Sequence, residues 1–233
     1  MSLLATIRPA IKRIGDEHVR LSNDDGLDLE KFFVCPPLST SKRVSEESGE
    51  TDEQTETKHV ALADLLDATE NVLLLGPPES GKTTLIHYAA LKTATGLTAT
   101  PRLPLRAKFY DFQKGRSAIW RAVRAYANEI SDGKIAAKVI ETTPILLFVD
   151  DVIAGDDLHL AYLLSLVKEA PNIRWVFCAD GNTRLTNVSA ENERRMEDFT
   201  TVSIGDLPRA SIRKLSAQWC AIGGFNWRMQ MRH

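Results

Sequence analysis

The eight residues GPPESGKT, Gly76 to Thr83, constrain the fold of this chain more than any other feature of its sequence. They follow the short apolar run VLLL at 72–75, which is typical of a strand buried on both faces. A helix is predicted from about Lys82 to Thr95, where Gly96 ends it. The spacing matches G-x-x-x-x-G-K-[ST], the pattern of a phosphate-binding loop between a strand and a helix.

The fixed positions of this loop each have a chemical reason. The two glycines allow tight turns, so that successive backbone N–H groups can converge on a polyphosphate. The free N–H groups and the positive dipole end of the following helix face the same phosphates. Lys82 can reach the β- and γ-phosphates, and the Thr83 hydroxyl can bind Mg²⁺. We therefore expect ATP and Mg²⁺ as cofactors, with nucleotide contacts from Gly76, Pro77, Pro78, Glu79, Ser80, Gly81, Lys82, Thr83 and Thr84.

The segment ILLFVDDV at 145–152 supplies the acidic groups that a nucleotide-bound metal needs. Residues 144–151 are predicted to be a strand, and ligands of open α/β sheets gather at the carboxyl ends of the strands. Asp150 is expected to hold Mg²⁺ through a water molecule, and Asp151 to polarise the water that attacks the γ-phosphate. The alternative is that both carboxylates only end the strand and are solvated. Asp156 and Asp157 are better explained as helix-start residues.

A third candidate follows the predicted buried strand IRWVFCA at 173–179. Asn182, Thr183 and Arg184 come shortly after it and can point into the same cleft. The planar guanidinium of Arg184 would match the oxygens of the terminal phosphate. A solvated loop position for Arg184 is an equally open alternative. The histidines have no partners at metal-ligand spacing.

Predicted strands and helices alternate through the rest of the chain, with strands near 103–112 and 200–204 and helices near 117–130, 156–170 and 208–222. This alternation predicts the α/β class: a three-layer core with a mostly parallel sheet of about five strands, plus a C-terminal helix. The core domain is expected over 59–207, after a leader at 1–40. Residues 41–58 hold one apolar residue, so they are predicted to be a flexible linker.

Charge and composition exclude several classes of partner. The net charge of −2 gives no overall basic field, so nucleic acid is not indicated. The three cysteines form no CxxC pair, which argues against a zinc site or a disulfide framework and fits a reducing compartment. The longest apolar runs are too short to span a bilayer, and the first residues lack the pattern of a signal peptide. We expect a cytoplasmic protein without a membrane partner.

The motifs together resemble those of the signal-transducing NTPases called STAND proteins, the NACHT and NB-ARC classes. VLLLGPPESGKTTLIHYAA is similar to their first nucleotide motif, and ILLFVDDV to the second motif of the NB-ARC class. Val152, Ile153 and Ala154 leave the NACHT version of that motif incomplete. IRWVFCADGNTRL resembles the strand whose tip carries the sensor arginine, which would be Arg184. FFVCPPL resembles the leader that lies near the adenine in NACHT proteins.

This resemblance implies ATP binding with slow Mg²⁺-dependent hydrolysis in a signalling switch, and it implies protein partners or sensor and effector domains outside this sequence. VSIGDLPRASIRKLSAQW is similar to the segment that begins the small helical domain of the family, so 208–233 is expected to be a truncated start of that subdomain. Three alternatives stay open. They are an AAA+ type ATPase, favoured by the GPP of the loop, a small-molecule phosphotransferase, and a nucleotide-binding interaction module whose hydrolysis is incidental.

Overall fold

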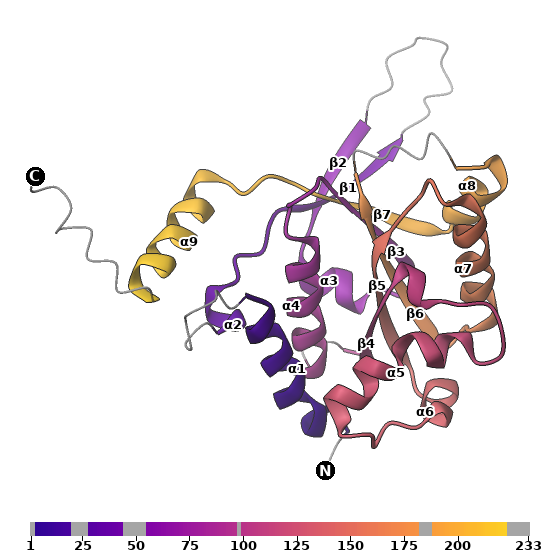
Figure 1. The fold of residues 1–233 in the computed structure, drawn as a ribbon. Helices are drawn as coiled ribbons and strands as arrows, with labels where there is room; N and C mark the ends of the chain where they lie inside the picture. Colours follow the sequence, from indigo (N-terminus) through magenta and orange to yellow (C-terminus); the bar gives the residue numbers. More distant parts are fainter. Residues whose placement is uncertain (1–2, 20–27, 44–54, 97–98, 182–187, 223–233) are drawn as a thin grey trace, which may run out of the picture.

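A computed structural model describes residues 3–19, 28–43, 55–96, 99–181 and 188–222. They form a seven-stranded sheet with helices on both faces (Figure 1), which confirms the predicted three-layer α/β class. The strands are β1 (Leu38–Arg43), β2 (Thr55–Val60), β3 (Asn71–Gly76), β4 (Leu103–Lys108), β5 (Ile145–Val152), β6 (Ile173–Asp180) and β7 (Phe199–Ile204). The helices are α1 (Leu3–Val19), α2 (Leu29–Phe32), α3 (Leu62–Asp67), α4 (Lys82–Ala94), the 3₁₀ helix η1 (Phe109–Asp111), α5 (Ala118–Ser131), α6 (Ala137–Thr142), α7 (Asp157–Glu169), α8 (Ala190–Met196) and α9 (Arg209–Ile222).

The strand order positions the functional edge of the sheet. It runs β2-β1-β7-β3-β6-β5-β4, and the five strands from β7 to β4 are parallel. β6 therefore lies between β3, which leads into the GPPESGKT loop, and β5, which carries the two aspartates. Because parallel strands end at the same edge, the loop and the aspartates meet there.

The sheet has two more strands than the five predicted, because the expected linker at 41–58 forms strands at both its ends. β1 and β2 pair as an antiparallel ribbon, with Leu38 opposite Val60 and Arg43 opposite Thr55, and β1 also pairs antiparallel with β7. The sequences LSTSKR and TETKHV are polar, so neither shows the apolar alternation of a half-buried strand. Backbone hydrogen bonds to β7 hold the ribbon instead. Residues 44–54 lie outside the described residues.

The expected leader at 1–40 contributes to the core of the domain. α1 packs along α4 and α5 (Figure 1), and its Ile7 and Ile11 are 0% and 2% exposed. Leu4 and Ile14 pack against the same core, so the apolar residues follow the spacing of one helical face. The segment expected to be a leader thus carries the apolar spacing of a helix in its sequence.

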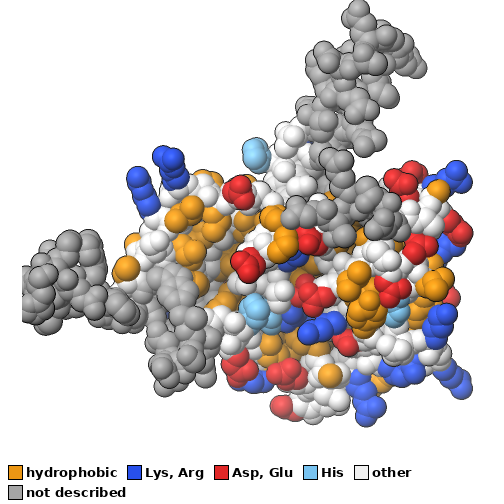
Figure 2. Space-filling view, turned by 45° about the horizontal axis from the view of Figure 1, so that its top comes forward, with side chains coloured by type: hydrophobic (Ala, Val, Ile, Leu, Met, Phe, Trp, Pro, Cys, Tyr) orange, Lys and Arg blue, Asp and Glu red, His pale blue; other side chains and the backbone are white. Residues whose placement is uncertain are grey.

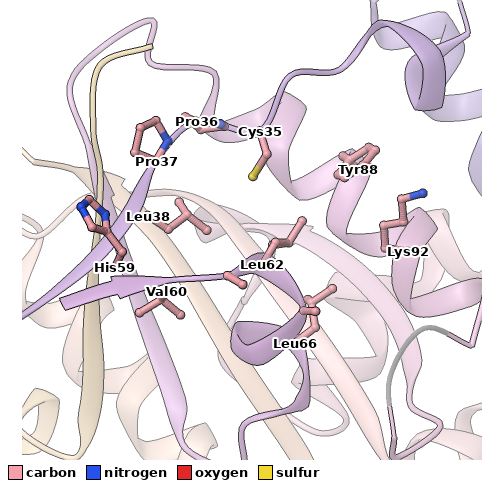
Figure 3. A pocket seen from close by; sticks show the side chains of 12 residues that line it. Cys35, Pro36, Pro37, Leu38, His59, Val60, Leu62, Leu66, Tyr88 and Lys92 are labelled. Carbon is pink, nitrogen blue, oxygen red and sulfur yellow. The ribbon is translucent and has the colours of Figure 1, made fainter. Parts of the chain in front are cut away.

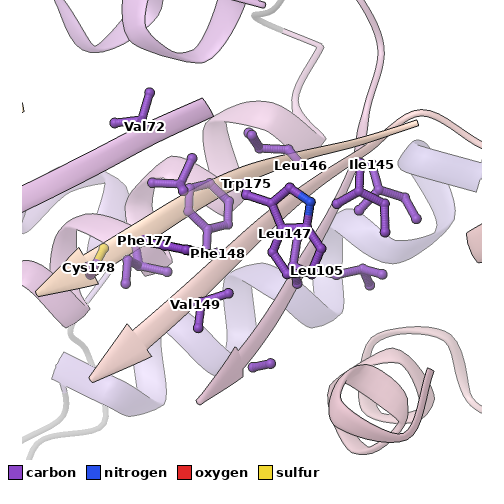
Figure 4. Packing of buried hydrophobic residues seen from close by; sticks show 14 of the residues in the cluster. Val72, Leu105, Ile145, Leu146, Leu147, Phe148, Val149, Trp175, Phe177 and Cys178 are labelled. Atoms are coloured by element: carbon purple, nitrogen blue, oxygen red, sulfur yellow. The ribbon is translucent and has the colours of Figure 1, made fainter. Parts of the chain in front are cut away.

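The centre of the sheet is apolar on both faces. β5 and β6 are buried along nearly their whole length, as the strands predicted at 144–151 and 173–179 require. Figure 4 shows Leu147, Trp175 and Phe177 among the buried side chains of these strands. At the amino-terminal end of β6, Arg174 donates hydrogen bonds to the carbonyls of Leu65 (2.7 Å), Leu66 (3.1 Å) and Glu70 (2.7 Å). These bonds hold the end of α3 against the sheet.

The surface gives two further facts. On the face seen in Figure 2, acidic and basic side chains are interspersed, and neither sign forms a continuous field. Among the described helices, none is long and apolar enough to cross a membrane.

Candidate functional site

The loop between β3 and α4 has the backbone that its sequence pattern predicts. Gly81 has a φ of 82° at the start of α4, and no side chain caps this helix, so its first N–H groups face the loop. A Cβ at Gly76 would lie 2.5 Å from Ser80 Oγ and 3.2 Å from the Ile204 side chain. A side chain at position 76 would therefore require the Ser80 and Ile204 side chains to shift.

Two polar groups of this loop fit a phosphate ligand. Ser80 Oγ is buried and has no hydrogen-bond partner within the described part of the chain. Lys82 Nζ donates to the carbonyls of Gly76 and Pro77, both at 2.7 Å, so its charge already lies across the loop. A buried hydroxyl without a partner is costly unless a ligand completes it. Of these two groups, the loop backbone satisfies Lys82, and the Ser80 hydroxyl stays without a partner among the described residues.

Asp150, the predicted metal ligand, and Asp151, predicted to polarise the attacking water, lie at an irregularity in β5. Its register with β6 shifts between Val149 and Val152, and Asp151 has a φ of 56°. A left-handed conformation costs a non-glycine residue about 1–2 kcal/mol, and such residues cluster at functional sites. The Asp151 N–H donates to Asp150 Oδ1 (3.0 Å), and Asp150 is only 6% exposed whereas Asp151 is exposed. The irregular strand end thus gives the two carboxylates different surroundings.

The loop and the aspartates share two neighbouring cavities. The first, of about 700 Å³, is lined by most of the predicted loop residues and by Asp151. Its other walls are His18, Val152, Ile153, Cys178 and Asp180. The second, of about 350 Å³, is lined by Thr83, Asp150 and Asp151 together with Arg106, Lys108 and Tyr126. Thr83 and Asp151 therefore stand between the two spaces.

These residues fit a Mg²⁺ ion that arrives with a triphosphate. Within the described ranges, no three His, Cys, Asp or Glu side chains form a metal-ligand group. Mg²⁺ is bound in proteins through one or two carboxylates, phosphate oxygens and water rather than by a full protein cage. The Thr83 hydroxyl and the Asp150 carboxylate are donors of that kind.

The predicted sensor residues Asn182, Thr183 and Arg184 lie outside the described residues. The end of β6 just before them is tied to the loop, because Gly181 N–H donates to Gly76 O (2.9 Å). A Cβ at Gly181 would lie 3.3 Å from Gly76 N, so a glycine allows this close approach. Sequence reasoning had assigned no role to Gly181 or to Asp180, although the strand-ending Asp-Gly pair was visible.

Sequence reasoning also missed a pair of stacked histidines behind the loop. The rings of His18 and His87 lie 4.3 Å apart, and His18 Nε2 is 3.2 Å from the Thr84 hydroxyl. Burial, then the charges of Arg106 and His18, lower the pKa of His87 to about 2. His87 is therefore neutral and accepts a hydrogen bond from Arg106 Nη1, which lies 2.7 Å from Nε2 and 2.9 Å from Nδ1.

The predicted leader forms a third cavity, of about 420 Å³, beside α4 (Figure 3). The lining residues shown there come from the leader, from β2 and α3, and from α4, and include Cys35, Pro37, Leu62, Tyr88 and Lys92. The ring of Phe33 stacks on Tyr88 at 4.3 Å, which fixes the leader against the helix that begins at Lys82.

Comparison with solved structures finds similar folds at low sequence identity. Domain III of the replication initiation protein DnaA from Thermotoga maritima is 12% identical, with a TM-score of 0.44 over 66% of this chain and 62% of that one. AMPPCP-bound DnaA from Aquifex aeolicus is 15% identical, with a TM-score of 0.40 over 70% and 59%. Cdc6p from Pyrobaculum aerophilum is 12% identical, with a TM-score of 0.41 over 67% and 46%.

This chain thus spans less than two thirds of each of these structures, and the similarity concerns the fold alone. No protein-family model and no curated protein sequence matches the chain.

Proposed function

We propose that this chain binds ATP with Mg²⁺ and hydrolyses it slowly, as the nucleotide-dependent switch of a signal-transducing NTPase. One observation carries the proposal. The GPPESGKT loop has an uncapped helix start, and it opens on a cavity that Lys82 and Thr83 line together with Asp151. Donors in such a concave arrangement match the charge and the oxygen count of a triphosphate.

The residues divide into binding and chemical roles. Lys82 leaves the Gly76 and Pro77 carbonyls and pairs with the β- and γ-phosphates. Thr83 and Asp150 hold the metal, which when bound neutralises the charge that develops on the phosphates. Asp151, exposed to the cavity, orients the water that attacks the γ-phosphate.

The base binds beside the leader in this proposal. The cavity between Pro37, Leu62 and Tyr88 is apolar enough for a purine ring, and its lining includes Lys92, whose ammonium is ion-paired with Glu30 at 3.0 Å. The leader reaches this position along α4, the same helix whose first turn meets the phosphates. This arrangement agrees with the adenine position that the STAND resemblance implies.

We expect slow turnover because hydrolysis depends on a positive charge placed beside the γ-phosphate. A well-placed arginine contributes about 10³–10⁵ in rate to phosphate-loop hydrolysis. Among the residues that the structure describes, no arginine lines the 700 Å³ cavity on which the loop opens. We therefore expect turnover below about one per second, the low end of typical enzymes.

Calorimetric titration of the purified chain with Mg·ATP and Mg·ADP tests the binding proposal. Lys82→Ala should weaken ATP binding at least tenfold, because a charged hydrogen-bond partner contributes about 1.5–3 kcal/mol. Lys138→Ala, an exposed lysine on α6, is the matched control and should bind like the unmutated protein. An affinity for ATP that Lys82→Ala leaves unchanged contradicts the assignment of the site.

Product analysis separates the remaining alternatives. ADP and phosphate without an acceptor support hydrolysis, whereas transfer to a small molecule indicates a phosphotransferase. Nucleotide-driven ring formation indicates an AAA+ type ATPase. Tight binding with no measurable product indicates an interaction module.

A further inference from the structure

Arg106 lies beside the proposed metal site without an acidic partner of its own. It belongs to β4, the strand next to β5, and its register partner is Phe148, two residues before Asp150. Its side chain lines the 350 Å³ cavity whose other walls include Thr83, Asp150 and Asp151. The second cavity therefore brings a guanidinium to the residues that are proposed to hold Mg²⁺.

The groups that support Arg106 are neutral. Its Nη1 donates to the uncharged ring of His87, and its guanidinium lies 5.8 Å from the centre of the Tyr126 ring. Its Nε is buried and has no hydrogen-bond partner in the described structure. No Asp or Glu of the described ranges lies within ion-pair distance of it. Arg106 is half-buried, and a cation partly withdrawn from water on neutral supports is unfavourable until an anion compensates it.

Once a metal ion is bound, the other charged groups of the cavity do not neutralise the positive charge of Arg106. The carboxylates that act on Arg106 at longer range are Asp150 and Glu129. A metal ion held by Asp150 would withdraw that compensation and add a like charge. Asp111, a third carboxylate on the wall, accepts a hydrogen bond from the Lys108 N–H (2.8 Å), and the Lys108 side chain is a second cation there.

We propose that Arg106 binds a phosphate group in this cavity and so couples phosphate binding to metal binding. The inference rests on the proposed function, since the anion that accompanies Mg²⁺ into the site is the nucleotide. Two sources supply the same chemistry. They are the terminal phosphate of the bound triphosphate and orthophosphate that remains beside bound ADP. A guanidinium suits either, because its fork matches two phosphate oxygens.

The test replaces Arg106 by Gln, which can still donate to His87 but carries no charge, and by Lys, which keeps the charge without the fork. Arg124→Gln, at an exposed arginine of the neighbouring helix α5, is the matched control. Calorimetry measures the affinity for the non-hydrolysable β,γ-methylene analogue of ATP and for ADP, both with Mg²⁺. A second titration adds orthophosphate to the protein saturated with Mg·ADP. Thermal melting verifies that each variant is folded.

If the terminal phosphate is the source, Arg106→Gln weakens binding of the analogue at least tenfold and changes ADP affinity less than twofold, with Arg106→Lys between the two. If orthophosphate is the source, Arg106→Gln loses orthophosphate binding to the ADP complex and keeps the analogue affinity. Equal losses for analogue and ADP, or no change in either titration, overturn the inference while the proposed function stands. An unmutated protein that binds neither nucleotide refutes the proposed function, and the inference falls with it.

Discussion

His87 should make the stability of this protein depend on pH. The side chain is 6% exposed, stacks on His18 and accepts a hydrogen bond from Arg106. Burial, the nearby charge of Arg106 and then that of His18 lower its pKa to about 2, from an ordinary value of 6.5. The folded protein therefore takes up the proton much less readily than the unfolded chain does. His18, whose pKa burial and Arg106 also lower, adds to the effect in the same direction.

The sign and size follow from proton linkage. Above pH 6.5 both states hold a neutral His87, and its contribution to folding is complete. Below pH 6.5 the unfolded chain is protonated first, so the free energy of unfolding falls by about 1.4 kcal/mol per pH unit until the folded pKa is reached. Between pH 7 and pH 5 the loss from His87 is about 2 kcal/mol.

Thermal unfolding of the unmutated protein and of His87→Gln at pH 7, 6 and 5 measures this loss. For a protein of this size, 1 kcal/mol corresponds to about 2–4 °C in Tm, so Tm of the unmutated protein should fall about 4–8 °C further than that of His87→Gln. His159→Gln, whose ring contacts the Phe109 carbonyl, is the matched control. If His87→Gln loses Tm with pH as steeply as the unmutated protein, the buried neutral histidine is not the cause.

Three further predictions concern the two aspartates and the buried arginine. Asp150→Asn should weaken Mg²⁺-dependent ATP binding, whereas Asp151→Asn should slow turnover at nearly unchanged affinity, and unchanged phosphate release in both variants would exclude both roles. Asp151→Ala should lower the free energy of urea unfolding by about 1 kcal/mol relative to Asp151→Asn, since asparagine tolerates the left-handed backbone better; equal stability would show that the backbone is not strained. Arg174→Met should cost about 1–3 kcal/mol in the same assay, because it leaves the Leu65 carbonyl of α3 without its donor while Arg102 still donates to Leu66, and a change below about 0.5 kcal/mol would contradict that role.

The sequence predicted those parts of the fold that local patterns determine. The loop after β3, the helix from Lys82 and the buried strands β5 and β6 each have a motif or an apolar run of the right length, and the structure confirms them. The C-terminal helix at 208–222 corresponds to α9. The β1–β2 ribbon was missed because its strands are polar, and a hairpin of that kind is recognised only through its pairing with β7.

The candidate site could be predicted only in part, because its remaining groups are brought together by strand order. Nothing local indicates that β6 inserts between β3 and β5, so the approach of Gly181 to Gly76 was not foreseen. Arg106 lies in the strand predicted near 103–112, and the sequence gives it no further role. Its contact with His87 joins β4 to α4. Such side-chain pairs depend on how the strands and helices pack together, and the spacing of residues in the sequence does not predict that packing.

The hydrogen bonds of Lys82 affect how a loss of ATP affinity in Lys82→Ala is to be interpreted. Its two hydrogen bonds to Gly76 and Pro77 link the start of α4 to the beginning of the loop before any ligand arrives. Lys82 therefore also orders the loop in the nucleotide-free protein. Its removal should speed amide hydrogen exchange across Gly76–Gly81 in that state. The affinity lost on mutation combines a missing charge with a less ordered loop. Exchange rates of the free protein would separate these two contributions, which a binding constant alone reports as one.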